Sequence, residues 1–187
     1  MRIISGRLKG FVFKVPKGIR PTEQKVSKSL FDILTPDIQD VKFLELYAGS
    51  GNIGIEAFSR GAKQVVMVEQ NGQNTSVINE NIALILNRFS FVDPSSIQVL
   101  TLDAESAIKK FSARQEKFEI VFLDPPYYKE LAKKTLQTLD QYDIVAPNGL
   151  VVAQAHRKDS MPDLKNLRLY RKEYYSDTAL YFLLKKS

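Results

Sequence analysis

The chain contains no cysteine and only one histidine, His156, in 187 residues. Without cysteine it can form no disulfide, no thiolate metal site and no thiolate nucleophile. A single histidine gives little support for a multi-histidine metal centre or a Ser-His-Asp hydrolase. We therefore expect no metal site, and we predict that His156 is only a strand-end residue.

Long apolar runs are absent as well. No segment is long enough to cross a bilayer, and residues 1–7 are too polar for the apolar part of a signal peptide. We expect a cytoplasmic protein with no membrane partner. At 44% hydrophobic content, the chain has enough apolar material for one globular domain with a single large core.

Positive charge is concentrated at the start of the chain. The net charge is +6, but residues 1–31 hold eight lysines and arginines against Glu23 alone, a net of +7 that leaves −1 for the rest. This distribution is expected of a surface that follows nucleic-acid phosphates, although a solvated face that confers solubility gives the same pattern. The candidate nucleic-acid contacts are Arg2, Arg7, Lys9, Lys14, Arg20 and Thr22.

The first 36 residues predict a small unit of their own. Residues 2–16 indicate a basic hairpin of two short strands around Gly6 and Gly10. A helix is then predicted to begin at residues 21–22 and to end before Pro36, with apolar residues at helical spacing.

From Val41 onward, short apolar strands alternate with helical segments, which is typical of a Rossmann-like α/β fold with a doubly wound, mostly parallel sheet. The last two strands, joined by Ser176-Asp177, predict a hairpin that adds an antiparallel edge. The predicted strands are Val41–Leu46, Gln64–Glu69, Ile97–Leu102, Phe118–Leu123, Leu150–Ala155, Leu167–Tyr174 and Ala179–Leu184, and the helices are Asn52–Arg60, Gln73–Asn87, Ala104–Phe111 and Lys129–Tyr142.

A glycine-rich turn follows the first of these strands. Gly49 and Gly51 allow a tight bend and close approach to a ligand, and Gly54 permits close packing of helix on strand. Glu69 ends the next strand, where its carboxylate is placed to accept hydrogen bonds from ribose hydroxyls. This pattern indicates a nucleotide-like cofactor, although a turn that needs glycine only for its geometry is the simpler alternative.

The glycine turn does not choose between NAD and S-adenosylmethionine. Glu45 lies just before the turn, where its charge would repel a pyrophosphate and attract a methionine ammonium group. Asp103 is a candidate for the cofactor adenine and equally a helix N-cap, while Asn81 is expected to be an ordinary polar helix residue. The cofactor-binding candidates are Glu45, Tyr47, Ala48, Gly49, Ser50, Gly51, Glu69, Gln70, Asp103 and Ala104.

The motif that decides the predicted chemistry is Asp124-Pro125-Pro126-Tyr127, directly after an apolar strand. The prolines stiffen the backbone and remove donors, so carbonyl acceptors are fixed in direction. An amine on an aromatic base is a poor nucleophile, and acceptance of its N–H bonds by Asp124 and the Pro125 carbonyl would restore its lone pair while Tyr127 stacks on the base. A plain turn after a strand is the alternative. The lack of cysteine argues against carbon methylation through a thiolate adduct.

The chain resembles the RsmD-type methyltransferases, which modify the 2-amino group of a guanine in bacterial small-subunit ribosomal RNA. The resemblance implies the seven-stranded methyltransferase fold, S-adenosylmethionine as methyl donor, and the assembling small subunit as partner. On this basis residues 1–36 form an RNA-facing appendage and residues 37–187 the methyltransferase domain. The residues that carry the resemblance are 2–6, 20–22, 30–34, 48–51, 59–62, 68–69, 124–127 and 177–180. The sequence departs from the usual family pattern at residues 26–29, Gln154 and Ser176.

Other functions share parts of this pattern. An adenine-amine methyltransferase of DNA or a protein-glutamine methyltransferase shares the core motifs, but the chain has no separate target-recognition domain. An NAD-dependent oxidoreductase is supported by the glycine turn alone, and a non-catalytic RNA-binding module would keep only the fold. We expect the protein to act as a monomer.

Overall fold

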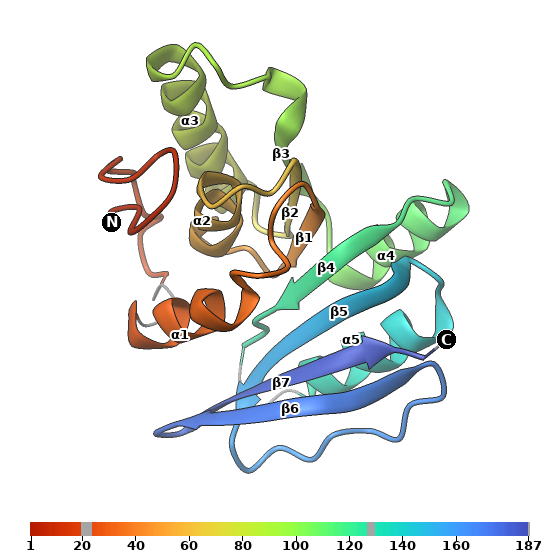
Figure 1. Cartoon of the computed structure of the whole chain (residues 1–187). Helices are drawn as coiled ribbons and strands as arrows, with labels where there is room; N and C mark the ends of the chain where they lie inside the picture. The colour runs from red at the N-terminus through yellow and green to blue at the C-terminus, as the bar shows by residue number, and fades with distance from the viewer. Residues whose placement is uncertain (20–23, 127–129, 187) are drawn as a thin grey trace.

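A computed structural model of the chain describes residues 1–19, 24–126 and 130–186, and seven strands in it form one sheet (Figure 1). The helices are α1 Gln24–Leu34, α2 Asn52–Ser59, α3 Gly72–Arg88, α4 Ala104–Ala113 and α5 Leu131–Gln141, with a short 3₁₀ turn at Pro94–Ser96. The strands are β1 Lys42–Leu46, β2 Gln64–Glu69, β3 Ile97–Thr101, β4 Phe118–Leu123, β5 Val145–His156, β6 Leu167–Tyr175 and β7 Thr178–Lys185.

The strand order is β3-β2-β1-β4-β5-β7-β6. The first five of these strands run parallel, and β7 runs antiparallel to both β5 and β6. The predicted doubly wound sheet with an antiparallel C-terminal hairpin is therefore confirmed. The order reverses between β1 and β4, and ligands of such sheets bind at the carboxyl ends of the strands beside this reversal.

Alternation along the strands divides the apolar side chains between two layers. Phe43, Met67 and Phe122 belong to the core under α1, α2 and α3, while Leu44, Val66 and Val121 belong to the core under α4 and α5. Figure 1 shows the two sets of helices on opposite faces of the sheet. In the described parts of the chain, no helix combines the length and the apolar character that a membrane crossing requires.

Several predicted boundaries shift in the structure. β5 begins five residues earlier than expected, at Val145, because Val145 pairs with Phe118 of β4 before an irregularity that ends where Leu150 pairs with Ile120. His156 is the last residue of β5, as predicted. Ser176 takes a left-handed conformation with φ 53° in the β6–β7 turn, where the family usually has glycine.

The predicted N-terminal hairpin reverses as expected, but the prediction of two strands in it is wrong, because the pairing is reduced to one bridge. Arg2 and Val12 form an isolated antiparallel bridge, the Ile3 N–H donates to the Phe11 carbonyl at 2.9 Å, and residues 5–10 form bends and turns. The physical reason is that the backbone of the turn bonds to α2, which prevents a longer ladder between the two arms. The Arg7 N–H donates to the Ser59 carbonyl at 2.7 Å, and the Leu8 N–H donates to the Ser59 hydroxyl at 2.9 Å.

A buried glutamate on α2 holds this N-terminal segment (residues 1–19). The Glu56 carboxylate, 2% exposed, accepts hydrogen bonds from the Ile4 N–H at 2.8 Å and the Ser5 N–H at 3.1 Å. It also pairs with the Arg60 guanidinium at 2.7 Å. Ile3, Leu8, Phe11 and Phe13 join the core under α2 and α3, so this segment is packed through both polar and apolar contacts.

Asn81 has a more specific role than the expected one of an ordinary polar helix residue. Its side chain is fully buried on α3, accepts a hydrogen bond from the Lys14 N–H at 2.8 Å and donates to the Lys14 carbonyl at 2.9 Å. The amide therefore substitutes for a strand partner at the end of the N-terminal segment. The division of the chain at residue 36 stays a prediction.

Replacement of Glu56 by glutamine should destabilise the fold, because an amide cannot accept all of the bonds that the buried carboxylate accepts. We expect Glu56→Gln to lower the free energy of unfolding by about 1–3 kcal/mol. Glu80→Gln is the matched control, since Glu80 pairs with Lys14 on the surface, and it should cost less than about 1 kcal/mol. Urea unfolding measures both, and equal small losses would contradict the anchoring role of Glu56.

Candidate active site

The candidate site lies where three parallel strands end side by side. Leu46, the last residue of β1, pairs with Val68 on β2 and with Leu123 on β4. Leu123 in turn pairs with Ala153 on β5. This register brings the glycine turn, Glu69, Asp124 and Gln154 together at the carboxyl ends of the parallel strands. The sequence motifs are thus brought together as predicted.

The glycine turn is held by short backbone bonds. The Ala48 N–H donates to the Val68 carbonyl at 2.9 Å, and the Gly51 N–H donates to the Ala48 carbonyl at 2.7 Å. Gly49 has φ 55°, a conformation that disfavours residues with a side chain. A Cβ atom at Gly54 would stand 2.8 Å from the Glu45 carboxylate and 2.7 Å from Met67, so the close approach of α2 to the sheet requires glycine.

Glu69 closes the turn from the neighbouring strand. Its Oε2 accepts the Gly49 N–H at 2.8 Å, and its Oε1 accepts the Asn71 N–H at 2.8 Å. Each carboxylate oxygen has two lone pairs, so both can accept a further hydrogen bond from a ligand hydroxyl. The backbone bonds fix the direction in which those lone pairs point.

Glu45 is the most perturbed ionisable group of the site. Its side chain is buried on β1 and accepts the Gly54 N–H at 2.9 Å. Burial, assisted by the charges of Asp124 and Glu69 and opposed by the Gly54 N–H, raises the pKa of Glu45 from the usual 4.5 to about 8. Glu45, Asp124 and Glu69 therefore interact as an acidic cluster, in which the charges of Asp124 and Glu69 disfavour a pyrophosphate and favour a cationic ligand.

The remaining cofactor candidates surround this cluster. Tyr47 has φ 61°, and its hydroxyl lies 2.8 Å from that of Thr135 on α5. Ala48 and Ser50 are buried in the turn, and Gln70 is exposed just after β2. The sequence pattern did not reveal Thr135, because its contact with Tyr47 depends on how α5 packs.

Asp103 caps α4, directly before Ala104. Its carboxylate accepts the Ser106 N–H at 2.9 Å, a bond that lowers the pKa of Asp103. The N-cap alternative is therefore confirmed. The cap uses one carboxylate oxygen, and the role towards an adenine stays a prediction. Within the described ranges, no group of three or more histidine, aspartate or glutamate residues is arranged to hold a metal ion.

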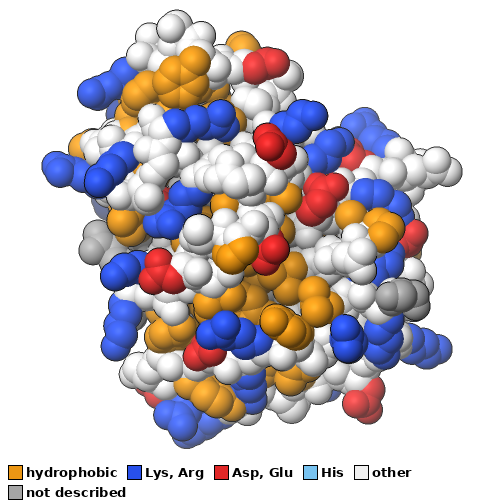
Figure 2. Space-filling model, viewed as in Figure 1, with side chains coloured by type: hydrophobic (Ala, Val, Ile, Leu, Met, Phe, Trp, Pro, Cys, Tyr) orange, Lys and Arg blue, Asp and Glu red, His pale blue; other side chains and the backbone are white. Residues whose placement is uncertain are grey.

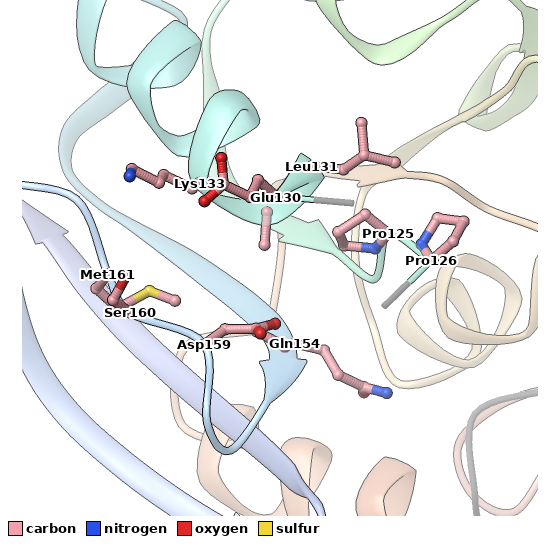
Figure 3. Close-up of a pocket in the computed structure, with 11 residues that line it drawn as sticks. Pro125, Pro126, Glu130, Leu131, Lys133, Gln154, Asp159, Ser160 and Met161 are labelled. Carbon is pink, nitrogen blue, oxygen red and sulfur yellow. The ribbon is translucent and has the colours of Figure 1, made fainter. Parts of the chain in front are cut away.

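A small, open pocket lies beside the second motif (Figure 3). Figure 3 shows Pro125 and Pro126 at the end of β4 and Gln154 on β5, with the loop after β5 on the other side. Asp124 is half-buried at the start of the proline pair, and Tyr127 lies outside the described residues. The pocket is lined by Pro125, Pro126, Glu130, Leu131, Ala132, Lys133, Gln154, Ala155, Asp159, Ser160 and Met161.

Sequence reasoning missed most of this pocket wall. Gln154 stood out only as a departure from a family pattern, yet it is buried beside the proline pair. Residues 159–161 belong to no motif. Their position along the chain could have indicated them, because a loop that follows the carboxyl end of a parallel strand faces the ligand crevice.

The RNA candidates of the N-terminal segment differ in their surroundings. The Arg7 guanidinium donates to the Phe58 and Ala62 carbonyls at 3.1 and 3.2 Å and lies 3.9 Å from the Phe58 ring centroid. Lys14 pairs with Glu80 at 2.7 Å. Arg2 and Lys9 are exposed, and Arg20 and Thr22 lie outside the described residues.

Comparison with known proteins gives matches along nearly the whole chain. The sequence model of the family described as "Conserved hypothetical protein 95" matches residues 1–184. YlbH of Bacillus subtilis, provisionally named an rRNA methyltransferase, is 34% identical over 184 residues that cover 96% of each chain. Ribosomal RNA small subunit methyltransferase D of Buchnera aphidicola is 30% identical, with 97% of this chain and 92% of that protein covered.

A solved structure gives the same result for the fold. The yhhF protein of Escherichia coli, provisionally titled a methyltransferase, superposes with a TM-score of 0.85 at 28% identity. The match covers 100% of this chain and 98% of that one. The agreement therefore extends over the N-terminal segment as well as the sheet.

The raised pKa of Glu45 should appear as a pH dependence of stability. The folded protein holds a proton on Glu45 up to about pH 8, whereas the unfolded chain releases it near the usual 4.5. The free energy of unfolding should therefore fall as pH rises between these values. Relative to Glu45→Gln, we expect the wild type to lose about 2–4 kcal/mol across this window.

Urea unfolding at pH 5 and pH 8.5 measures this difference. Glu80→Gln is again the control, because Glu80 is exposed on α3, and its difference from the wild type should not change with pH. A wild-type pH slope that persists unchanged in Glu45→Gln would rule out the buried, protonated state of Glu45.

Proposed function

The chain belongs to the family described as "Conserved hypothetical protein 95", and on this premise we propose that it transfers a methyl group from S-adenosylmethionine to the 2-amino group of a guanine in small-subunit ribosomal RNA. The RsmD-type resemblance inferred from the sequence is confirmed by this membership and by the Buchnera aphidicola relative. The observation that carries the proposal is the register of β1 with β2 and β4, which sets Asp124 and Pro125 beside the glycine turn and its neighbouring acid Glu69.

The residues of the turn fit S-adenosylmethionine, which when bound supplies the methyl group together with its own leaving group. The charges of Glu69 and Asp124 suit its cationic groups, and Glu45 adds its own charge when it releases its proton, since opposite charges attract strongly at a buried site. Glu69 accepts the ribose hydroxyls, Asp103 accepts the adenine amine, and the backbone of Ala48 to Gly51 lies against the ligand. The same acidic cluster disfavours NAD, whose pyrophosphate is negatively charged.

Asp124 and the Pro125 carbonyl act on the base amine. They accept its two N–H bonds, which localises the nitrogen lone pair and stabilises the positive charge that develops on nitrogen. As the N–C bond forms, the nitrogen loses one of these protons to the Asp124 carboxylate, which passes it to solvent. Pro125 and Pro126 hold both acceptors in place before the substrate arrives. Tyr127 stacks on the base, and the adjoining pocket receives a base that has left its stack.

RNA is favoured over other substrates by the charge of the N-terminal segment. Arg2 and Lys9 are exposed there, and Lys14 forms a solvent-exposed ion pair with Glu80. Exposed cations on one segment suit a phosphate backbone. The partner is ribosomal RNA in the assembling small subunit, and the enzyme acts as a monomer. An adenine-amine DNA methyltransferase or a protein-glutamine methyltransferase is the rival function.

The substrate is tested with labelled S-adenosylmethionine and three acceptors: immature small-subunit particles, duplex DNA and ribosomal proteins. We expect label in the RNA of the particles, and mass-spectrometric mapping should place it on the 2-amino group of one guanine. Label in DNA or protein without label in RNA would refute the proposal. Binding of NAD but not of S-adenosylhomocysteine in titration calorimetry would refute the methyltransferase chemistry itself.

The role of Asp124 is tested by substitution. Asp124→Ala should keep its affinity for S-adenosylhomocysteine within a few-fold, since the ligand is held by β1 and β2. Its methylation rate should fall by at least about 100-fold, because one of the two acceptors of the amine is lost. Asp37→Ala is the control, an exposed aspartate in the turn after α1, and it should act as the wild type does. Unchanged turnover of Asp124→Ala would show that Asp124 is not catalytic.

A further inference from the structure

The outermost strand, β6, combines exposed rings with exposed cations. Tyr170 is 67% exposed and Tyr174 is 52% exposed. Arg168, Arg171 and Lys172 are exposed on the same strand. In Figure 2, lysine and arginine side chains alternate with hydrophobic ones over the lower part of the molecule, where β6 and β7 lie.

The segment from the end of β5 to the end of β6 is positively charged, although the chain beyond residue 31 has almost no net charge. Residues 156–175 hold six lysines and arginines against three acids. The chain beyond residue 31 is nearly neutral as a whole, so the positive charge is concentrated here and balanced elsewhere. A positive patch of this kind complements a phosphate backbone.

Printed contacts connect β6 to the wall of the pocket. The Tyr181 hydroxyl on β7 donates to the carbonyl of Asp159, which lines the pocket, at 3.4 Å. The Lys172 ammonium lies 4.6 Å from the Tyr181 ring centroid and 4.8 Å from that of Tyr174. The Arg157 guanidinium lies 5.8 Å from the Tyr174 ring. Arg157 follows β5, whereas Lys172 and Tyr174 are on β6; we call these three residues together the β6 strip.

Cations on an edge strand also prevent sheets from pairing edge to edge. That role needs no exposed aromatic rings, which instead make an edge more adhesive. Rings flanked by cations are the combination with which proteins bind single-stranded nucleic acid, because bases stack on the rings and phosphates meet the cations. The composition of the β6 strip therefore favours a nucleic-acid ligand over simple protection of the edge.

We propose that the β6 strip binds single-stranded nucleotides next to the target base, with one base stacked on Tyr174 and phosphates paired with Arg157 and Lys172. This inference rests on the proposed function, and it adds a contact surface on the side of the pocket formed by the loop after β5. A target base that leaves its stack leaves its neighbours without a stacking partner, and the exposed Tyr174 ring supplies one.

The test uses the whole protein and a fluorescein-labelled 12-nucleotide single-stranded RNA, with anisotropy as the readout. Tyr174→Ala should weaken binding by about 5- to 100-fold, and Tyr174→Phe, which keeps the ring, should bind within about twofold of the wild type. Lys172→Ala should weaken binding and lower the slope of log Kd against log salt by about one. Lys63→Ala is the control, because Lys63 is exposed directly before β2, which is separated from β6 by four strands, and it should change neither quantity.

Each outcome has a definite meaning. Unchanged RNA binding by both Tyr174→Ala and Lys172→Ala would overturn the inference, as would an equal loss in Tyr174→Phe. If these variants bind the oligonucleotide normally but fail only on protein-containing particles, the strip contacts a ribosomal protein and the inference is also wrong. Methylation of RNA by the wild type tests the proposed function separately, so the strip can fail while the enzyme assignment stands.

Discussion

Parallel pairing of β1 with β2 on one side and β4 on the other is the constraint on which the site depends. Parallel strands in register end at one level, and the order of the strands reverses at this place, so the loops after β1, β2 and β4 open into one crevice. The glycine turn, Glu69 and Asp124 are separated by tens of residues along the chain. Backbone hydrogen bonds between the strands, rather than contacts among these side chains, bring them together.

Buried carboxylates hold the elements around this crevice in place. Glu45 accepts an N–H group from the first turn of α2, Glu69 accepts one from the glycine turn and one from the chain after β2, and Glu56 accepts two from the N-terminal segment. An ionised acceptor makes a stronger hydrogen bond than a neutral one, but burying its charge has a cost. Glu56 has Arg60 as a counter-charge, whereas Glu45 avoids the cost by retaining a proton. A cationic ligand at this edge would offset that cost.

The distribution of positive charge has two parts in the folded chain. At the N-terminus, Arg7 and Lys14 are exposed but already bonded within the protein, Arg7 to backbone carbonyls and Lys14 to Glu80, so fewer cations lack a protein partner than the count suggests. After β5 and on β6, Arg157 and Lys172 flank an exposed tyrosine. Local charge at a surface, rather than the net charge of a segment, governs such contacts.

The sequence by itself determined the order and type of nearly every element after residue 40, because apolar periodicity and the turn residues are local signals. It also determined the glycine turn and Asp124-Pro125 as the chemical motifs. Only the tertiary structure decided that the N-terminal hairpin is reduced to one bridge and bonded to Glu56, Ser59 and Asn81, that Arg7 donates to backbone carbonyls, and that Gln154 and the loop after β5 complete the pocket. These features depend on which distant groups meet when the layers pack, and no local pattern encodes that meeting.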